Sequence, residues 1–229
     1  MKGTISVKRD GKWVTFSGEY EATTPVTVIL SELNSRDPLL DVKGREVEPI
    51  EWECSCGQKV CGACAMVING TPRLACSTFF GEAGPDIRLE PLSKFPLIAD
   101  LKVDRTQMYD SLSEMKLWLD EGVDAKVRNI DLQYASASCM LCGCCLEICP
   151  NYTGRGKFFG AAGMNACFRI ADQLDGAAKR ARLKEFARHG DSGCSKSLSC
   201  GQVCPQNIPL AVLISRMNRD RIISMFIRD

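Results

Sequence analysis

The chain has 229 residues, of which 45% are hydrophobic and 25% are charged, a balance typical of a globular protein that can bury a core. Its 29 Lys and Arg residues nearly match its 28 Asp and Glu residues, so the net charge of +1 gives no indication of a nucleic-acid partner. We expect no membrane span, because no stretch approaches 18 uncharged apolar residues, and no signal peptide, because residues 1–10 lack an apolar core and a twin arginine.

The N-terminal part of the chain carries the pattern of short strands with one helix. Residues 4–7 and 13–17 are β-type runs, and Asp10-Gly11 between them favours a hairpin turn. After Pro25, apolar residues recur on one face at helical spacing, which predicts a helix. The residues on that face are Val26, Ile29, Leu30 and Leu33.

Two further strands are expected before residue 100. Residues 65–68 are apolar and end at Asn69-Gly70, a second hairpin signal. Ile87 and Leu89 alternate with polar residues and predict one more strand. Together these patterns predict a small mixed sheet crossed by one helix.

The C-terminal part is patterned as helices. Residues 108–119 and 158–174 each carry an apolar stripe, formed by Met108, Leu112, Met115 and Leu119 and by Phe158, Ala162, Ala166, Ile170 and Leu174. Residues 178–188 predict a basic helix closed by Gly190, whose Lys and Arg side chains we interpret as a solvated face, with a docking patch as the alternative. A last helix is expected from Pro209 toward Met225.

The cysteine content of the chain is unusually high. Fourteen are present, and all but Cys167 fall into groups at 54–76, 139–149 and 194–204. Because roughly sixty residues separate the first group from the second, we expect two domains, 1–100 and 101–229. Disulfides, zinc and iron–sulfur clusters compete as explanations. A chain of this size needs no disulfides, and its one histidine, His189, excludes a Cys2His2 zinc finger and a two-histidine Rieske centre from this chain alone.

The first group has the spacing of a plant-type [2Fe–2S] loop, Cys56-x4-Cys61-x2-Cys64, followed by a more distant cysteine. Gly57 and Gly62 allow the backbone to curl around a cluster and to direct N–H groups at sulfur. Cys54 competes for the first ligand position, but the four-residue gap favours Cys56, and zinc is the alternative occupant. The predicted ligands are Cys56, Cys61, Cys64 and Cys76.

The second and third groups share one register. Cys139-x2-Cys142-x2-Cys145-x3-Cys149-Pro150 is the bacterial ferredoxin run, in which the fourth cysteine ligates the other cluster. A second run, Cys194-x2-Ser197-x2-Cys200-x3-Cys204-Pro205, repeats it with serine in place of the second cysteine. The two runs are therefore expected to exchange one ligand each.

This crossed register assigns two more clusters. A [4Fe–4S] site is predicted at Cys139, Cys142, Cys145 and Cys204, and a [3Fe–4S] site at Cys149, Cys194 and Cys200. The second site has only three thiolates, and a three-iron cluster is expected there because a cubane corner without a thiolate tends to lose its iron. Alternatively, Ser197 Oγ or water keeps a fourth iron there. Cys144 and Cys167 lie outside the register, and Cys167 is interpreted as a buried thiol.

Clusters supply no acid, base or nucleophile, so a chain with three of them is expected to conduct electrons rather than to transform an organic substrate. The order of the three motifs resembles the iron–sulfur subunit of succinate dehydrogenase and fumarate reductase. The resemblance covers nearly the whole chain and includes Phe159-Gly160-Ala161-Ala162-Gly163 after the second run. It implies an α+β chain with a β-grasp plant-type ferredoxin domain and an α-helical bacterial-ferredoxin-like domain.

The same resemblance implies partners and a location. A flavoprotein subunit with FAD would lie nearest the [2Fe–2S] cluster. A membrane anchor with a quinone site, which can carry heme b, would lie nearest the [3Fe–4S] cluster. The chain would then be peripheral on the cytoplasmic face of the cell membrane. By this resemblance Pro150, Asn151 and Ser197 correspond to quinone-side positions.

The chain departs from the family pattern at defined positions. The first loop commonly reads Cys-Arg-x-Gly-x-Cys, whereas residues 56–61 read Cys-Gly-Gln-Lys-Val-Cys, which affects the expected potential but not the ligation. Ubiquinone-using relatives carry tryptophan and histidine where this chain has Thr153-Gly154 and Ser195, so the menaquinone-using members are more similar. Two alternative functions are a soluble thiol-linked fumarate reductase or related flavin reductase, and a zinc scaffold without redox activity.

Overall fold

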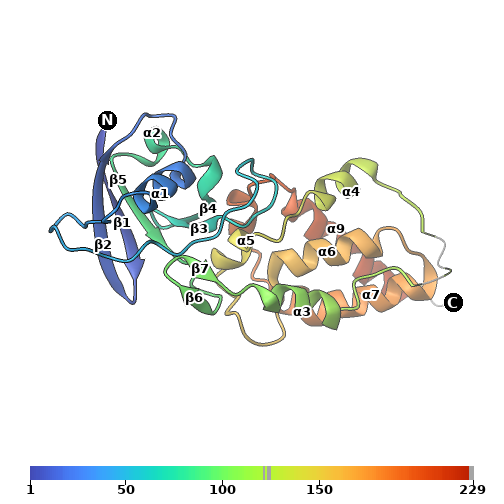
Figure 1. Cartoon of the computed structure of the whole chain (residues 1–229). Helices are drawn as coiled ribbons and strands as arrows, with labels where there is room; N and C mark the ends of the chain where they lie inside the picture. Colours follow the sequence, from blue (N-terminus) through green and yellow to red (C-terminus); the bar gives the residue numbers. More distant parts are fainter. Residues whose placement is uncertain (121, 123–124, 227–229) are drawn as a thin grey trace. The chain divides into compact units, whose positions relative to one another are not determined.

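The computed structural model describes residues 1–120, 122 and 125–226, and the chain forms two compact units (Figure 1). The N-terminal unit is Met1–Asp104 together with Cys142–Cys144. The helical unit is Arg105–Leu141 together with Cys145–Asp229. The short segment Cys142–Cys144 therefore packs with the sheet-bearing unit although it belongs to the second cysteine run.

The N-terminal unit contains the expected mixed sheet. Its strands are β1 (Lys2–Arg9), β2 (Lys12–Glu19), β3 (Ala65–Ile68), β4 (Thr71–Leu74) and β5 (Asp86–Glu90). Their order across the sheet is β2-β1-β5-β3-β4. The β1–β5 pair is parallel and the other pairs are antiparallel. The first and the last of these five strands along the chain are therefore neighbours inside the sheet.

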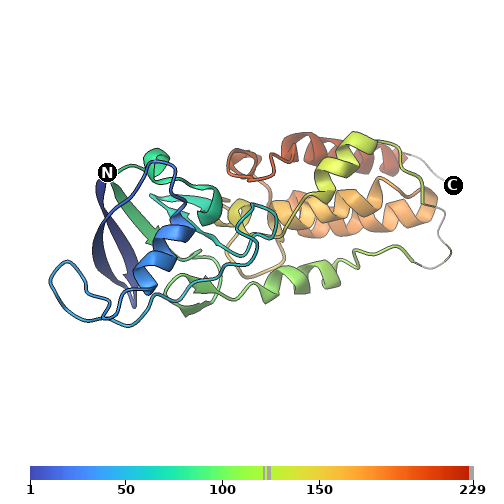
Figure 2. The same ribbon diagram turned by 45° about the horizontal axis from the view of Figure 1, so that its top comes forward.

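One helix, α1 (Val26–Asn34), crosses this sheet (Figure 2). Its predicted apolar face is confirmed, because Val26, Ile29, Leu30 and Leu33 are all fully buried. The sheet contributes further buried side chains to the same core, including Ile5, Phe16, Ile87 and Leu89.

The two predicted hairpin turns are also confirmed. Asp10 and Gly11 have φ values of 46° and 75°, and Asn69 and Gly70 have values of 50° and 77°, the left-handed pairs that a tight two-residue hairpin requires. The unit is completed by short elements: η1 (Ala75–Ser77), α2 (Phe80–Ala83), and the antiparallel pair β6 (Leu97–Ala99) and β7 (Lys102–Val103).

The second unit is helical, as expected. Its elements are α3 (Thr106–Glu114), α4 (Ile130–Ala137), α6 (Gly160–Ala171), α7 (Gly176–His189), η2 (Asp191–Gly193), α8 (Ser199–Gln202) and α9 (Leu210–Phe226). The short α5 (Cys144–Glu147) begins in the segment that packs with the first unit. A core of α6, α7 and α9 side chains fills the centre, including Phe168, Leu183, Phe186, Leu213 and Met217.

Two helical stripes differ from the sequence expectation. The helix predicted over 108–119 ends at Glu114, because Lys116 adopts φ 51° and the Leu117 N–H donates back to the Leu112 carbonyl, a left-handed helix end. In α6 the residues Ala166 and Ile170 are only half-buried, although they belong to the predicted stripe. This helix packs against α3, α4, α7 and α9, so its buried surface is wider than one stripe.

The basic helix 178–188 is confirmed as α7, but the interpretation of its cations as a uniformly solvated face is wrong for two of them. Lys179 Nζ lies 2.7 Å from an oxygen of Asp220 on α9, and Arg182 lies 3.2 Å from an oxygen of Asp120. The Arg182 side chain is only 9% exposed. These cations hold α7 to its neighbours, because a partly buried charge needs a partner of opposite sign.

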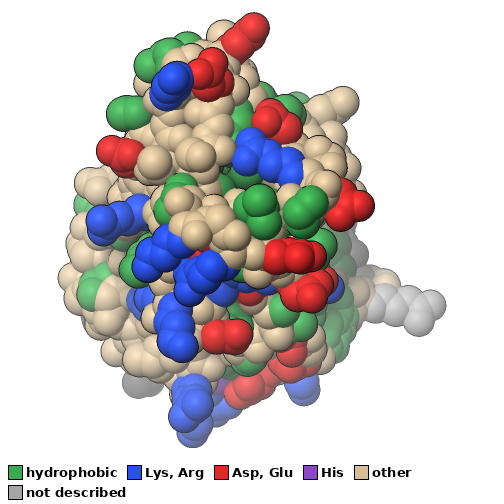
Figure 3. Space-filling model, turned by 60° about the vertical axis from the view of Figure 1, so that its left-hand side comes forward, with side chains coloured by type: hydrophobic (Ala, Val, Ile, Leu, Met, Phe, Trp, Pro, Cys, Tyr) green, Lys and Arg blue, Asp and Glu red, His purple; other side chains and the backbone are tan. Residues whose placement is uncertain are grey.

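None of the helices in the described ranges is both long and apolar enough to cross a membrane. The molecular face drawn in Figure 3 carries both basic and acidic side chains, in keeping with a net charge near zero. Neither basic nor acidic side chains form one continuous patch over that face.

Candidate iron–sulfur centres

The first cysteine group lies in the loop that leads into β3, with Cys76 in η1. The loop curls tightly, because Gly57, Lys59 and Gly62 all have positive φ values, of 63°, 61° and 76°. A curl of this kind turns successive backbone N–H groups toward its inside. Cys56 and Cys61 are half-buried on the loop, while Cys64 and Cys76 are buried at 2% and 7% exposure.

Backbone N–H groups are directed at the sulfurs of this loop. The Gln58 N–H donates to Cys56 Sγ at 3.3 Å, the Ala63 N–H to Cys61 Sγ at 3.5 Å, and the Cys76 N–H to Cys64 Sγ at 3.4 Å. The expected N–H···S contacts are therefore present on these sulfurs. Such bonds stabilise a thiolate, which is the form that binds iron.

The surroundings of the thiols in this group shift their pKa values in different directions. Backbone N–H groups, those of Gln58 and Val60 foremost, lower the pKa of Cys56 to about 7. Burial raises the pKa of Cys64 to about 12. Burial also raises the pKa of Cys54, and the neighbouring Cys76, Cys61 and Cys56 raise it further. Cys54 therefore lies near three of the predicted ligands.

The second and third groups meet in the helical unit. Cys139, Cys145, Cys194, Cys200 and Cys204 all pack against its hydrophobic core. Burial raises the pKa of Cys200, and the nearby Cys149 and Cys194 thiols act in the same direction. Cys149 belongs to one run and Cys194 and Cys200 to the other, so thiols of the two runs lie near enough to act on one another electrostatically. Their binding of a [3Fe–4S] cluster remains a prediction.

Cys142 lies in the segment that packs with the N-terminal unit. The next residue, Gly143, has a φ of 90°, and a Cβ there would meet the Phe95 ring at 3.0 Å and Leu92 at 3.2 Å. Glycine is required at this position for both its backbone conformation and its packing. Cys144, which follows, is fully buried.

The predicted quinone-side residues have different surroundings. Pro150 and Ser197 are exposed, and the Ser199 hydroxyl donates to Ser197 Oγ at 3.4 Å. Asn151 is engaged with the protein, because its amide Nδ2 donates to the Gly193 carbonyl at 2.8 Å. That carbonyl directly precedes Cys194, so the bond joins the ends of two ligand runs.

A buried set of contacts around His189, close to the ligand runs, was not predicted from the sequence. His189 is 1% exposed, its Nδ1 lies 2.8 Å from the Lys157 carbonyl, and its ring stacks on Phe159 at 4.3 Å between centroids. The Phe159 N–H donates to the His189 carbonyl at 2.8 Å. The one histidine of the chain was a signal that could have been used, because His189 lies only five residues before Cys194.

The remaining cysteine, Cys167, is an interior residue as interpreted. It is fully buried on α6, and burial raises its pKa to about 12. No group of three or more Cys, His, Asp or Glu side chains in the described part of the chain is arranged to hold a single metal ion. The fourteen cysteines all carry thiols in the described structure rather than disulfides.

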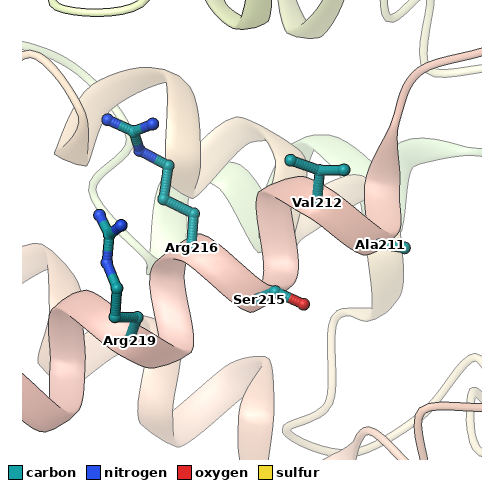
Figure 4. A pocket seen from close by; sticks show the side chains of 5 residues that line it. All are labelled: Ala211, Val212, Ser215, Arg216 and Arg219. Carbon is teal, nitrogen blue, oxygen red and sulfur yellow. The ribbon is translucent and has the colours of Figure 1, made fainter.

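A hollow of about 470 Å³ lies along α9, away from these residues in the sequence. It is lined by Ala211, Val212, Ser215, Arg216 and Arg219, and the two guanidinium groups project to the same side of the helix as Val212 (Figure 4). Arg216 is anchored, because its Nε lies 3.2 Å from a carboxylate oxygen of the buried Asp172. These lining residues include none of the predicted cluster ligands.

Comparison with known proteins agrees with this arrangement of sites. Residues 4–110 match the family model of the 2Fe-2S iron-sulfur cluster binding domain, and residues 135–208 match that of the 4Fe-4S dicluster domain. Both cysteine-bearing parts of the chain are thus covered. The zinc alternative has no counterpart among these matches.

Relatives extend the likeness over most of the chain. The succinate dehydrogenase iron-sulfur subunit of Bacillus subtilis is 36% identical over 92% of this chain and 87% of its own length. The fumarate reductase iron-sulfur subunit of Wolinella succinogenes is 31% identical over 76% of this chain and 78% of its own length. A chain of the solved Mycobacterium smegmatis Sdh1 complex in the apo form shares the fold, with a TM-score of 0.77 and 21% identity over 99% of this chain and 98% of that chain. The chain belongs to the family of succinate dehydrogenase and fumarate reductase iron–sulfur subunits.

Proposed function

We propose that this chain is the electron-transfer subunit of a succinate:quinone oxidoreductase or quinol:fumarate reductase. In this role it relays electrons between FAD in a flavoprotein subunit and a quinone in the membrane. The clusters supply reversible one-electron transfer when bound, and the chain supplies their ligands, their spacing and the groups that tune them. The organic chemistry takes place on partner subunits.

The observation that carries the proposal is the meeting of the two sequence-distant runs. The Cys149 and Cys194 thiols both act electrostatically on Cys200, which supports the grouping that a pair of exchanged ligands requires. A zinc scaffold has no need for such an exchange. The N–H groups directed at Cys56, Cys61 and Cys64 in the other unit support a cluster there, because they offset negative charge on sulfur.

The residues present fit three clusters. Cys56, Cys61, Cys64 and Cys76 would hold the [2Fe–2S] cluster, and Cys139, Cys142, Cys145 and Cys204 the [4Fe–4S] cluster. Cys149, Cys194 and Cys200 would hold the [3Fe–4S] cluster, with Ser197 at the corner that lacks a thiolate. The two domains of the proposal are residues 1–100 and 101–229.

The proposed partners are a flavoprotein subunit with FAD and one or more membrane-anchor subunits with a quinone site and room for heme b. The chain would then be held peripherally on the cytoplasmic face of the membrane. Menaquinone is the proposed quinone, because Thr153-Gly154 and Ser195 replace the tryptophan and histidine of ubiquinone-using relatives.

Electron paramagnetic resonance of the anaerobically purified complex tests the proposal. We expect a [3Fe–4S] signal in the oxidised sample and a [2Fe–2S] signal that develops on stepwise reduction. Succinate or a quinol should reduce the clusters through the partner subunits. Two full cubanes, or a preparation that contains zinc without acid-labile sulfide, would contradict it.

A further inference from the structure

Two segments of the helical unit are joined close to the predicted three-iron site. One runs from Cys149 to Phe159, and the other runs from His189 to Cys194. At the ends of the segments away from Cys149 and Cys194, the joint consists of the His189 contacts with Lys157 and Phe159. These contacts are buried and fix where the two segments begin to run side by side.

The same two segments pack tightly along their length. A Cβ on Gly193 would meet the Phe158 ring at 2.4 Å, so only glycine admits this approach. Asp191, in the same turn, is also tied to α9, because Arg221 Nη2 lies 2.8 Å from its carboxylate. The turn that leads into Cys194 is therefore held from two sides.

Asn151 joins the two segments at their other end, near Cys149 and Cys194. It lies two residues after Cys149, and the carbonyl that its amide contacts at 2.8 Å lies one residue before Cys194. No other described side-chain hydrogen bond between these segments lies so near both cysteines. An amide is suited to the task, because its N–H donates to a carbonyl while carrying no charge.

We propose that Asn151 is a positioning residue that holds the second cysteine run against the third, and so keeps Cys149 at the distance from Cys194 and Cys200 that a shared cluster needs. This rests on the proposed function, since the shared cluster is the [3Fe–4S] centre. The role differs from direct contact with a quinone, because it requires only the bond from one N–H of the Asn151 amide to the Gly193 carbonyl within the chain.

Two substitutions of Asn151 test the role in the intact complex. Asn151→Ala removes the donor, and Asn151→Asp keeps the shape but places a carboxylate oxygen against the Gly193 carbonyl. The rate of loss of the oxidised [3Fe–4S] signal in mild denaturant is the main measurement, with the [2Fe–2S] signal of the same sample as the reference for folding. We expect loss about threefold to tenfold faster for Asn151→Ala, the worth of one exposed hydrogen bond, and faster still for Asn151→Asp.

A matched control comes from the turn before Cys194. Ser192 Oγ donates to the Arg188 carbonyl on α7, so this bond does not link the turn to the segment from Cys149 to Phe159. Ser192→Ala should leave the rate of signal loss within about twofold of the unmodified complex.

The KM for a water-soluble naphthoquinone separates positioning from quinone contact. Positioning predicts a faster signal loss with an unchanged KM. A raised KM with an unchanged rate of loss would overturn it in favour of a quinone contact, and no change in either would overturn it outright. If the unmodified complex lacks a [3Fe–4S] signal, the proposed function fails first, whereas a normal signal with unaffected Asn151 variants defeats the positioning role alone.

Discussion

At the scale of single residues, the chain shows how one side-chain type acquires different chemistry from its surroundings. The N–H groups of Gln58 and Val60 lower the pKa of Cys56 to about 7, whereas burial raises the pKa of Cys64 and Cys167 to about 12. Hydrogen bonds to the charged form and desolvation act in opposite directions, and local geometry decides which one dominates. Sequence spacing identified the group to which each cysteine belongs, but not this difference.

The raised pKa of Cys167 makes a prediction about its reactivity. Because a folded-state pKa near 12 exceeds the ordinary value of 9, burial of the neutral thiol stabilises the fold fully below pH 9 and loses that effect as the pH rises toward 12. At pH 8 only about 10⁻⁴ of the thiol is ionised, so iodoacetamide should leave Cys167 unmodified in the folded chain. Peptide mass spectrometry after alkylation checks this.

The unfolded chain is the control for that measurement. In denaturant at the same pH, Cys167 should react at the rate of an ordinary thiol. Modification of Cys167 in the native chain, at a rate similar to that in denaturant, would show that α6 opens or that the thiol is accessible.

Ser197 gives the second prediction at this scale. Its position in the third run is that of the missing thiolate, so Ser197→Cys should complete four ligands with Cys149, Cys194 and Cys200. The oxidised-state [3Fe–4S] signal should then disappear, and a second cubane signal should develop on reduction. Ser195→Cys is the matched control, because that position lies outside the register. An unaltered oxidised signal in Ser197→Cys would mean that the register is wrong.

At the scale of elements, a buried polar pair joins two helices of the second unit. Ser136 on α4 and Asn165 on α6 are 0% and 2% exposed. The Ser136 hydroxyl donates to Asn165 Oδ1 at 2.8 Å, and Asn165 Nδ2 donates to the Ser136 carbonyl at 3.0 Å. Since α4 leads directly into Cys139, this pair also fixes the start of the second cysteine run.

Asn165→Ala should lower the free energy of unfolding by about 1–3 kcal/mol, because it removes two buried hydrogen bonds and leaves the Ser136 hydroxyl with only a 3.3 Å contact to the carbonyl of residue 165. Urea denaturation followed by circular dichroism measures the change. Gln133→Ala on α4 is the control, since the contacts of the Gln133 side chain with Arg169 on α6 and with Asp172 just after α6 are long, at 3.3 Å and 3.4 Å. Equal effects of the two substitutions would argue against a special role for the buried pair.

At the scale of the whole molecule, the proposed electron relay depends on the predicted exchange of ligands between the second and third cysteine runs. It predicts that Cys204→Ala, a change in the third run, removes the [4Fe–4S] signal of the second run. Cys149→Ala, a change in the second run, should remove the [3Fe–4S] signal instead. Spectra of the two variants, each compared with the unmodified complex at matched reduction, check the exchange.

Loss of the local cluster in each case would show that the runs do not exchange ligands. Cys167→Ala is the control, because that thiol lies on α6 outside both runs. All three signals should persist in this variant. Iron and acid-labile sulfide, measured in the same samples, should fall only where a signal is lost.

The sequence by itself determined the two kinds of cluster-binding domain, their order, the mixed sheet with its two hairpins, and most helices of the second unit. These follow from local rules, because ligand spacing, turn dipeptides and apolar periodicity all act within a few residues. The structure also agrees with the buried state that was expected for Cys167.

Only the tertiary structure decided which sequence-distant groups meet. The early end of α3, the wide burial of α6 and the paired cations of α7 depend on neighbours that periodicity does not encode. The proximity of Cys54 to Cys61 and Cys76 also depends on packing. So does the hydrogen bond from Asn151 to the Gly193 carbonyl. A single residue pattern specifies which face of an element is apolar, but the partner of a charge or an amide is set by packing between elements far apart in the chain.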